Sequence, residues 1–315
     1  MRTKAAAAAL THEMFLLADF GEERGDAVLL DCALDSAGRV CVLMVDSVPE
    51  RIDGIFVQTV TRCEHHYSCL VIDEWGTRRF RPAPQRFNYH FFRLLDDGSP
   101  LLVGARSRYR SADDVDKNAT VFDGESGKVI RRFCLGDGIE DVAVSANGTI
   151  WTSYFDEGVL GNYGWNDPVG ACGVRSWDSD GMPRYSFDNS DGVIMDCYAL
   201  NAASDDDVWF YYYTDFKLGH INGEDVGFFE VPVSGSNGFA VSHGRVLFRG
   251  GYDDRQAFYL CVNKKGRFGK KRALVPVDGA GRRITIEAFS AAGGAFIVVE
   301  GNRIYRSSLD DIRAE

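Results

Sequence analysis

The chain has 315 residues, a length that could hold two domains, and 45% of them are hydrophobic. Its 46 acidic and 35 basic residues give a formal net charge of −11, which excludes the basic surface of a nucleic-acid binder and makes anionic membranes poor partners. No run approaches the roughly 20 apolar residues of a transmembrane helix.

The first residues, MRTKAAAAALTHE, contain an apolar stretch that is too short for the hydrophobic region of a signal peptide. We therefore expect residues 1–13 to form an N-terminal tail, with a short helical turn at most over the alanines. The chain has eight cysteines, and most of them, such as Cys32 and Cys41, lie inside apolar segments, where free thiols behave as small hydrophobic groups. These features favour a reduced, cytoplasmic protein.

Four segments share one layout, in which a polar residue is followed by a small apolar stretch and then by a glycine seven residues later. They are Asp31–Gly38 (DCALDSAG), Asp141–Gly148 (DVAVSANG), Asn237–Gly244 (NGFAVSHG) and Glu287–Gly294 (EAFSAAGG). A second apolar run follows each of them. The pattern predicts a strand, a tight turn and another strand, repeated along the chain.

Two further segments fit this layout with longer turns, one opening at Asn88 and one at Asp196. The six turns then fall near residues 38, 98, 148, 206, 244 and 294, with spacings close to the size of a four-stranded propeller blade. Period-2 hydrophobic runs dominate, and helical patterns are nearly absent. The sequence therefore predicts an all-β fold, a closed β-propeller of six four-stranded blades, with five or seven blades as alternatives because residues 100–136 and 154–192 are irregular.

The last unit supplies only three strands. Residues 14–20 (MFLLADF) are the strand left over at the other end of the chain, and we expect them to complete the last blade beside residues 302–309. The later strands of the first unit are expected at 54–63 and 67–75. Residues 1–315 are thus interpreted as a single domain.

The polar residues that open the six units should form a circle, because the innermost strands of a propeller line its central channel. They are Asp31, Asn88, Asp141, Asp196, Asn237 and Glu287, with Glu140 adjacent. Converging carboxylates repel one another, and oxygen ligands of this kind suit Ca²⁺ or Mg²⁺. We expect Asp31, Asp141, Asn237 and Glu287 as metal ligands; alternatively, these side chains cap loops in a water-filled channel.

Two of these segments resemble a known family. Asn237–Ser242 (NGFAVS), followed by a glycine turn, resembles an inner-strand motif of the gluconolactonase and strictosidine-synthase-like six-bladed propellers, and Asp141–Trp151 (DVAVSANGTIW) is similar to their other inner-strand motif. The resemblance implies a divalent cation held at Asn237 and Asp141 and an acidic residue acting as a base. The same motifs also resemble propellers of the NHL type, many of which bind no metal.

The expected catalytic groups are the carboxylates of Asp141, Glu287 and Asp196. Loops that follow the second strand of each unit should open beside them, and they carry arginines next to aromatic residues, a combination that suits a small polar or carboxylate-bearing molecule. The expected substrate-binding residues are Arg106, Arg108, Tyr154, Asp156, Glu157, Trp165, Tyr213, Asp215, Arg249 and Tyr252.

The leading functional hypothesis is an enzyme that acts on a small molecule, as a hydrolase of a lactone or ester or as a lyase or cyclase. The alternatives are a non-catalytic scaffold that docks a protein partner and a ligand sensor without turnover. The fold alone does not separate them.

Overall fold

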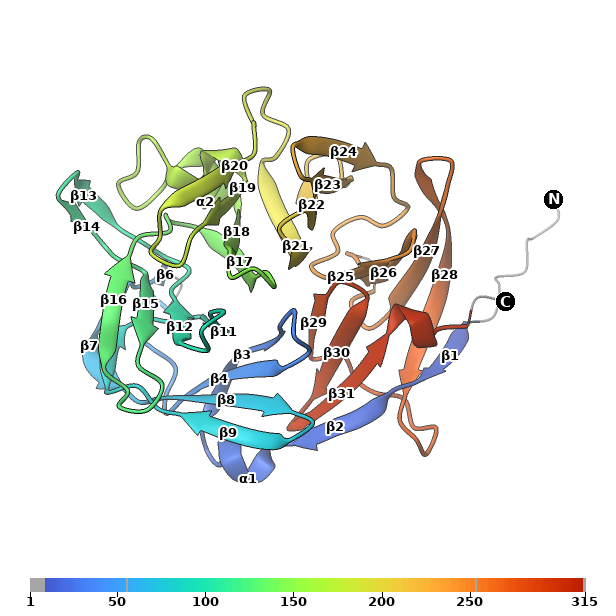
Figure 1. Cartoon of the computed structure of the whole chain (residues 1–315), viewed down its shortest axis with the longest axis horizontal. Coiled ribbons are helices and arrows are strands. Elements are labelled where there is room, and N and C mark those ends of the chain that lie inside the picture. Colours follow the sequence, from blue (N-terminus) through green and yellow to red (C-terminus); the bar gives the residue numbers. More distant parts are fainter. Residues whose placement is uncertain (1–8, 55, 253, 314–315) are drawn as a thin grey trace.

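Six antiparallel sheets surround a central axis in the computed structural model, which describes residues 9–313 except residues 55 and 253 (Figure 1). Five of the sheets contain four antiparallel strands in chain order, and one of these five gains β1 (Leu10–Glu13) as a parallel fifth strand; the sixth sheet takes β2 (Phe15–Asp19), from the start of the chain, as its fourth strand. The predicted all-β propeller with six blades is confirmed.

Blades I to III are built from the first half of the chain. Blade I contains β3 (Val28–Leu34), β4 (Val40–Val45), β8 (Tyr67–Asp73) and β9 (Gly76–Phe80). Blade II contains β11 (Phe91–Leu94), β12 (Pro100–Val103), β15 (Ala119–Phe122) and β16 (Val129–Phe133). Blade III contains β17 (Ile139–Val144), β18 (Ile150–Tyr154), β19 (Val174–Trp177) and β20 (Pro183–Ser186).

Blades IV to VI follow. Blade IV contains β21 (Asp196–Ser204), β22 (Asp207–Tyr213), β23 (Leu218–Asn222) and β24 (Asp225–Phe229). Blade V contains β25 (Phe239–Ser242), β26 (Arg245–Arg249), β27 (Phe258–Lys264), β28 (Arg267–Val277) and β1 (Leu10–Glu13). Blade VI contains β29 (Ala288–Ala292), β30 (Ala295–Glu300), β31 (Arg303–Ser308) and β2 (Phe15–Asp19).

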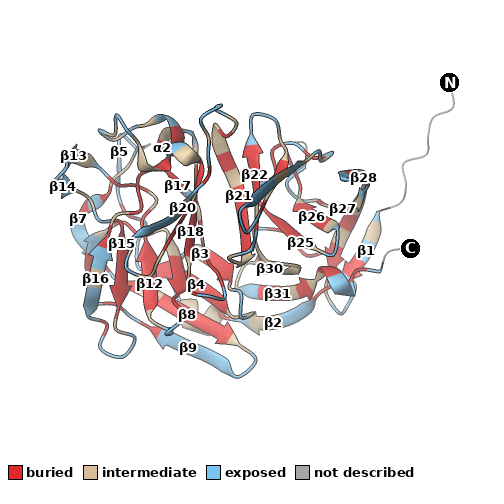
Figure 2. Cartoon of the chain, turned by 45° about the horizontal axis from the view of Figure 1, so that its top comes forward, coloured by how far each residue is buried: buried red, intermediate tan, exposed pale blue. Residues whose placement is uncertain are grey.

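The hydrophobic core lies between neighbouring blades. All six residues of β4 are buried, whereas four of the five residues of the outer strand β9 are exposed. Figure 2 shows this gradient from buried inner strands to exposed outer ones. Each core cluster combines residues of adjacent blades, as where Leu101 of blade II packs in one cluster with Val142 of blade III. Burial on both faces explains why the middle strands read as continuous apolar runs.

The N-terminal strand closes the ring as predicted. β2 pairs antiparallel with β31, with Leu16 opposite Tyr305 and Ala18 opposite Ile304. The first and last parts of the chain therefore share blade VI, and the edge that β31 would otherwise expose is paired.

Residues 10–13 were expected within a tail, and this prediction was wrong. They form β1, which pairs in parallel with β28, Leu10 lying opposite Leu274. His12 Nε2 lies 2.6 Å from Ser307 Oγ of blade VI, and Met14 is buried. The N-terminal segment therefore joins blades V and VI. The preceding alanines up to Ala8 lie outside the described residues.

Deletion of residues 1–13 is expected to lower the melting temperature by several degrees, because it removes β1 and the His12–Ser307 contact while leaving the closing strand β2 intact. Deletion of residues 2–8 is the matched control and should leave the melting temperature unchanged. Differential scanning calorimetry of the two variants compares them directly. Equal melting temperatures would show that β1 adds no stability.

Blade I differs from the prediction in its outer half. Residues 54–63 were expected to supply its third strand, but β8 and β9 take the third and fourth places. Residues 46–66 instead form an insertion that contains β5 (Arg51–Ile52), β6 (Phe56–Val57) and β7 (Val60–His65). β5 pairs with β6, and β7 pairs with β10 (Gln85–Phe87). A short hairpin of β13 (Tyr109–Ser111) and β14 (Asp114–Val115) extends blade II.

Among the described residues, helices are few and short. They are α1 (Gly21–Arg24), α2 (Asp156–Leu160) and two 3₁₀ turns at Val169–Cys172 and Leu309–Asp311. Across the described part of the chain, no helix has the length and apolar character needed to cross a membrane. None of the eight cysteines, all of which the structure describes, forms a disulfide bond.

Candidate active site at the channel mouth

The central channel is narrow. Its cavity has a volume of about 100 Å³, enough for a few water molecules. Every innermost strand contributes to its lining, through residues that include Ala33, Arg93, Ala143, Leu200, Phe239 and Ser290. A substrate would therefore bind above the channel rather than within it. We call the end at which the innermost strands begin the channel mouth.

Arg93 lies in the channel and was not predicted as a functional residue. It projects from β11, is only 6% exposed, and places Nη1 2.5 Å from Asp31 Oδ2 of blade I. Its Nη2 lies 3.3 Å from Asp141 Oδ1 of blade III, and its Nε donates a hydrogen bond to the Val142 carbonyl. One guanidinium thus bridges three blades. The positive charge that we expected from a metal ion is supplied to Asp31 and Asp141 by the chain itself.

The predicted metal ligands come together only in part. Asp31, Asp141 and Asn237 line the channel, but the exposed Glu287 turns away and its Oε2 accepts a hydrogen bond from the Gly301 N–H. Glu287 is therefore a turn cap, as the alternative interpretation allowed. Within residues 9–313, excluding 55 and 253, no three His, Cys, Asp or Glu side chains are grouped so that they could hold a metal ion. The divalent cation stays a prediction.

Asn88 and Asp196 were placed in the circle by sequence, and neither occupies the expected register. Asn88 precedes β11, is buried, and donates from Nδ2 to the Gln58 carbonyl. In blade IV, Ala199 pairs with β22 at the position that Asp141 holds in blade III. Asp196 therefore lies three residues nearer the channel mouth.

β-Bulges occur at equivalent positions in three innermost strands. The register skips one residue at Leu30 in β3, at Glu140 in β17 and at Tyr198 in β21, each just before the position of Asp31 or its equivalent. A bulge leaves the extra residue unpaired and redirects its side chain, and such irregularities are common beside active sites. Glu140 is the bulge residue next to Asp141, and it belongs to the candidate site. It was expected from the sequence next to the circle of six polar residues and not within it.

Four carboxyl groups interact at the channel mouth: Glu140, Asp141, Asp156 and Asp196. Glu140 keeps contact with water. Its pKa is nevertheless raised to about 8, mainly by desolvation of its carboxyl group and also by repulsion from the other three carboxylates. Burial raises the pKa of Asp141 to about 6 despite the opposing effect of Arg93. Burial and Asp156 raise the pKa of Asp196 to about 6.

Two polar atoms beside the channel mouth lack partners. Asp196 Oδ1 is buried and accepts no hydrogen bond from any described residue. Arg249 Nε is also buried and donates no hydrogen bond to any described residue. Arg249 Nη2 donates weakly to the carbonyls of Ile286 and Glu287. Buried polar groups are normally paired, so Asp196 and Arg249 each keep unused hydrogen-bonding capacity beside the channel mouth.

Aromatic rings form a wall next to Asp196. Tyr213 pairs with Asp196 across β21 and β22, and its ring is nearly parallel to that of Tyr198, 6.4 Å between centroids. The hydroxyls of Tyr198 and Tyr252 lie 2.6 Å apart. Tyr213 and Tyr252 are 42% and 56% exposed, as expected for substrate-contacting residues. Asp215, also predicted, is exposed and forms an ion pair with Lys217.

Several predicted substrate-binding residues instead hold the loop after β18. Arg106 donates two hydrogen bonds to Asp137, at 2.9 and 2.8 Å, and a third to Glu157 of α2. Its guanidinium also lies 4.1 Å from the centroid of the Tyr163 ring. All three contacts are internal, so Arg106 and Glu157 anchor the loop and are not free for a substrate.

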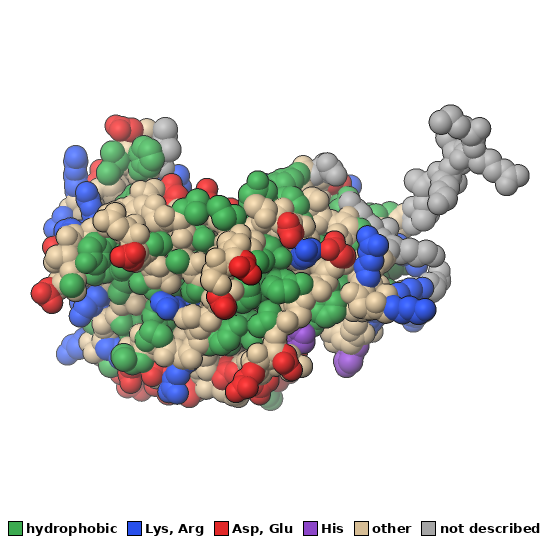
Figure 3. All heavy atoms as spheres, turned by 90° about the horizontal axis from the view of Figure 1, so that it is seen from above, with side chains coloured by type: hydrophobic (Ala, Val, Ile, Leu, Met, Phe, Trp, Pro, Cys, Tyr) green, Lys and Arg blue, Asp and Glu red, His purple; other side chains and the backbone are tan. Residues whose placement is uncertain are grey.

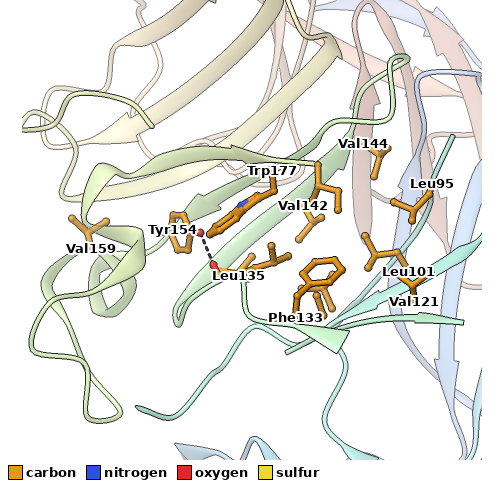
Figure 4. Packing of buried hydrophobic residues seen from close by; sticks show 14 residues of the cluster. Leu95, Leu101, Val121, Phe133, Leu135, Val142, Val144, Tyr154, Val159 and Trp177 are labelled. Atoms are coloured by element: carbon orange, nitrogen blue, oxygen red, sulfur yellow. Dashed lines mark hydrogen bonds between the residues drawn. The ribbon is translucent and has the colours of Figure 1, made fainter. Parts of the chain in front are cut away.

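Tyr154 and the partly buried Trp165 also form hydrogen bonds within the protein. Tyr154 is fully buried between blades II and III, where its hydroxyl donates to the Leu135 carbonyl at 2.6 Å (Figure 4). Trp165 Nε1 donates to the Ser107 carbonyl at 2.7 Å. Arg108 and Asp156 remain exposed, and of these only Asp156 belongs to the carboxyl cluster.

Six blades around a narrow channel, with ionisable groups at one mouth, define a six-bladed β-propeller with a candidate small-molecule site. A model described as the YxzG family matches residues 180–307, from the last strand of blade III through blade VI. The comparison with curated proteins finds no match.

Solved structures similar to the chain include a gluconolactonase from Xanthomonas campestris, at 12% identity over 97% of this chain and 99% of that one, with a TM-score of 0.42. The WD40 propeller domain of Doa1 is 14% identical over 96% of each chain, with a TM-score of 0.45. The propeller domain of Cps50 (Swd1) from Myceliophteria thermophila is 10% identical over 96% of this chain and 99% of that one, with a TM-score of 0.49. At these identities the likeness concerns the fold, which serves enzymes and scaffolds alike.

Proposed function

We propose that this protein is an enzyme that acts on a small polar molecule at the channel mouth by general acid–base catalysis. The observation that carries the proposal is the bulge in β17, which sets Glu140 and Asp141 side by side opposite the unpartnered oxygen of Asp196. Tyr213 and Tyr252 would flank the substrate, and Arg249 would donate to one of its oxygens.

The different environments of the carboxyl groups suggest which one donates a proton and which one accepts it. With a pKa near 8, Glu140 is mostly protonated at neutral pH, whereas Asp196, with a pKa near 6, is mostly ionised. A pair of carboxyl groups separated in this way provides a proton donor and a proton acceptor. Asp141 is held by Arg93 and keeps negative charge beside Glu140.

Hydrolysis of a lactone or ester fits these roles. Asp196 would take a proton from the attacking water, and Glu140 would give its proton to the departing alkoxide, so that one water is added across the bond and the total of protons on the two carboxyl groups is conserved. A lyase or cyclase step would use the same base and acid. A divalent cation would have to bind outside the Arg93-bridged pair.

The test is a pH-stat assay of the purified protein against a panel of lactones and carboxylic esters, in EDTA and with added Ca²⁺ or Mg²⁺. We expect turnover that falls in Asp196→Asn and persists in Glu125→Gln, a matched control on the exposed β15–β16 turn. A rate that requires the cation would support the predicted metal. Equal rates in wild type and Asp196→Asn would overturn the assigned base.

A scaffold is the second candidate, and one observation favours it. The insertion of blade I exposes four apolar side chains, Val48, Ile52, Phe56 and Val60, each at least 45% exposed. On the side of the ring seen in Figure 3, hydrophobic side chains lie among polar and charged ones. Absence of turnover across the panel, together with a partner whose binding is lost in Ile52→Asp, would favour the scaffold.

A further inference from the structure

A second pocket lies between blades II and III. Its volume is about 390 Å³, within the usual range for small-molecule sites. Its lining comes from the β13–β14 hairpin that extends blade II, from the loop after β18, and from β19 and β20 of blade III. Neither the four carboxyl groups of the channel mouth nor Tyr213, Tyr252 and Arg249 contribute to this lining. The pocket is therefore separate from the proposed active site.

The walls of this pocket are held against each other by contacts within the protein. The Tyr109 N–H of the hairpin donates to the Tyr163 carbonyl of the loop after β18, at 3.0 Å. The centroids of the Tyr109 and Trp165 rings lie 5.0 Å apart, and Trp165 Nε1 donates to the Ser107 carbonyl. The hairpin and the loop are thus fixed in place without a ligand, as is usual for small-molecule sites.

Most of the lining is apolar, and its side chains can be reached from solvent. Six apolar residues of the lining are half-buried or exposed: Ala112, Val115, Cys134, Trp165, Val169 and Pro183. A ligand that covers them removes apolar surface from water, which favours binding. The pocket therefore suits a molecule with an apolar body.

An arginine at this pocket has unused donors that a ligand can reach. Arg175 Nε donates to Ser186 Oγ at 2.8 Å, and the guanidinium carbon lies 5.2 Å from the centroid of the Trp177 ring. These two contacts orient the guanidinium, but Nη1 and Nη2 bond to no described residue, and neither atom is buried. The planar guanidinium matches the geometry of a carboxylate, which can accept from two of its N–H groups.

The charges of the lining favour an anion. Lys117 is exposed, and its side chain forms no ion pair or hydrogen bond with any residue that the structure describes. Asp113 is the one carboxylate of the lining. Arg175 and Lys117 thus give this pocket an excess of positive charge in a chain whose net charge is −11. Charge complementarity of this kind selects a ligand with one negative charge.

We propose that this pocket binds a small aromatic monocarboxylate, whose carboxylate pairs with Arg175 and Lys117. The ring of the ligand packs against Trp165 and Val169. A flat ring is favoured over a flexible chain because it loses less conformational freedom on binding and because it gains an aromatic contact with the indole.

The test compares benzoate, phenylacetate and 2-naphthoate with the corresponding amides, which have nearly the same shape and no charge. Each is titrated into the ¹⁵N-labelled full-length protein at concentrations up to the millimolar range. At least one carboxylate should shift the indole N–H resonance of Trp165 saturably, and leave that of Trp209 in blade IV in place. The Trp165 resonance is assigned by its loss in Trp165→Phe. This carboxylate should bind about fivefold more tightly than its amide, the effect expected of a partly exposed ion pair.

Two variants test the assigned charges. Lys117→Met and Arg175→Gln should each weaken binding of the carboxylate about fivefold and should not weaken binding of the amide. Lys117 is exposed, so Lys117→Met decides the test if Arg175→Gln does not fold. Lys128→Met removes an exposed lysine on the β15–β16 turn, outside the lining, and is the matched control that should bind as wild type does.

Three results would overturn the proposal: no carboxylate shifts the Trp165 resonance, each amide binds as tightly as its carboxylate, or Lys117→Met binds the carboxylate as tightly as wild type. None of these measurements depends on turnover, so they stand whether or not the proposed activity is found.

Discussion

Replacing Arg93 with methionine is expected to lower the free energy of unfolding by roughly 3 kcal/mol. Removal of one partner from a buried ion pair typically costs about 3–5 kcal/mol, because the remaining charge is left without compensation. The lower end applies here, since the Asp141 carboxylate keeps some contact with water. Urea unfolding should show a lower midpoint with an unchanged slope.

Two further variants make this test specific to charge. Arg78→Met removes an exposed arginine that lies 3.0 Å from Asp73, and it should cost about 1 kcal/mol or less. Adding Asp31→Asn and Asp141→Asn to Arg93→Met should recover part of the lost stability by removing the repelling charges. If Arg93→Met is as stable as Arg78→Met, the channel arginine does not hold the three blades together.

The sequence predicted the blades well because their strongest signal is local. A glycine seven residues after Asp31 and Asp141 fixes a tight turn, and Gly38 and Gly148 both adopt positive φ angles that other residues avoid. The closing strand was predictable from a count of strands in the last unit. β1 was missed because its pairing with β28 joins segments more than 260 residues apart.

The candidate site was less predictable, because its geometry depends on contacts between blades. Nothing local distinguishes Arg93 in the segment HFFRLLDD from a polar residue on a half-exposed strand. The bulge at Glu140 arises from the pairing of β17 with β18, so equal spacing to the glycine did not guarantee equal side-chain directions. Glu287 has the same seven-residue offset as Asp141 and yet caps the β30–β31 turn.

The Glu140→Gln variant is expected to lower kcat/KM by about 10²–10⁴, the usual contribution of a positioned acid or base. Wild-type kcat/KM should follow a bell-shaped pH profile, with limbs near the pKa of Asp196, about 6, and that of Glu140, about 8. Glutamine cannot donate this proton, so the alkaline limb should vanish in the variant. Retention of full activity, or of the alkaline limb, would exclude Glu140 as the acid.

The same proton should be visible in stability measurements without any substrate. The pKa of Glu140 rises from 4.5 to about 8 on folding, so between these pH values the folded state holds a proton that the unfolded state has released. Its contribution to stability is therefore complete below about pH 4.5 and is lost as the pH rises through 8. The slope reaches at most about 1.4 kcal/mol per pH unit, where the folded state holds one proton more than the unfolded state, and contact of Glu140 with water reduces the total stability at stake.

Comparison of wild type with Glu140→Gln isolates this effect. Asp141 and Asp196, with pKa values near 6, titrate in both proteins, so their contributions cancel in the difference between the two stability curves. The variant should gain stability relative to wild type from pH 6 to pH 8, measured as the difference in urea midpoints. Parallel curves over this range would mean that Glu140 is already ionised in the folded protein at pH 6, and the proposed acid would then have no proton to give at neutral pH.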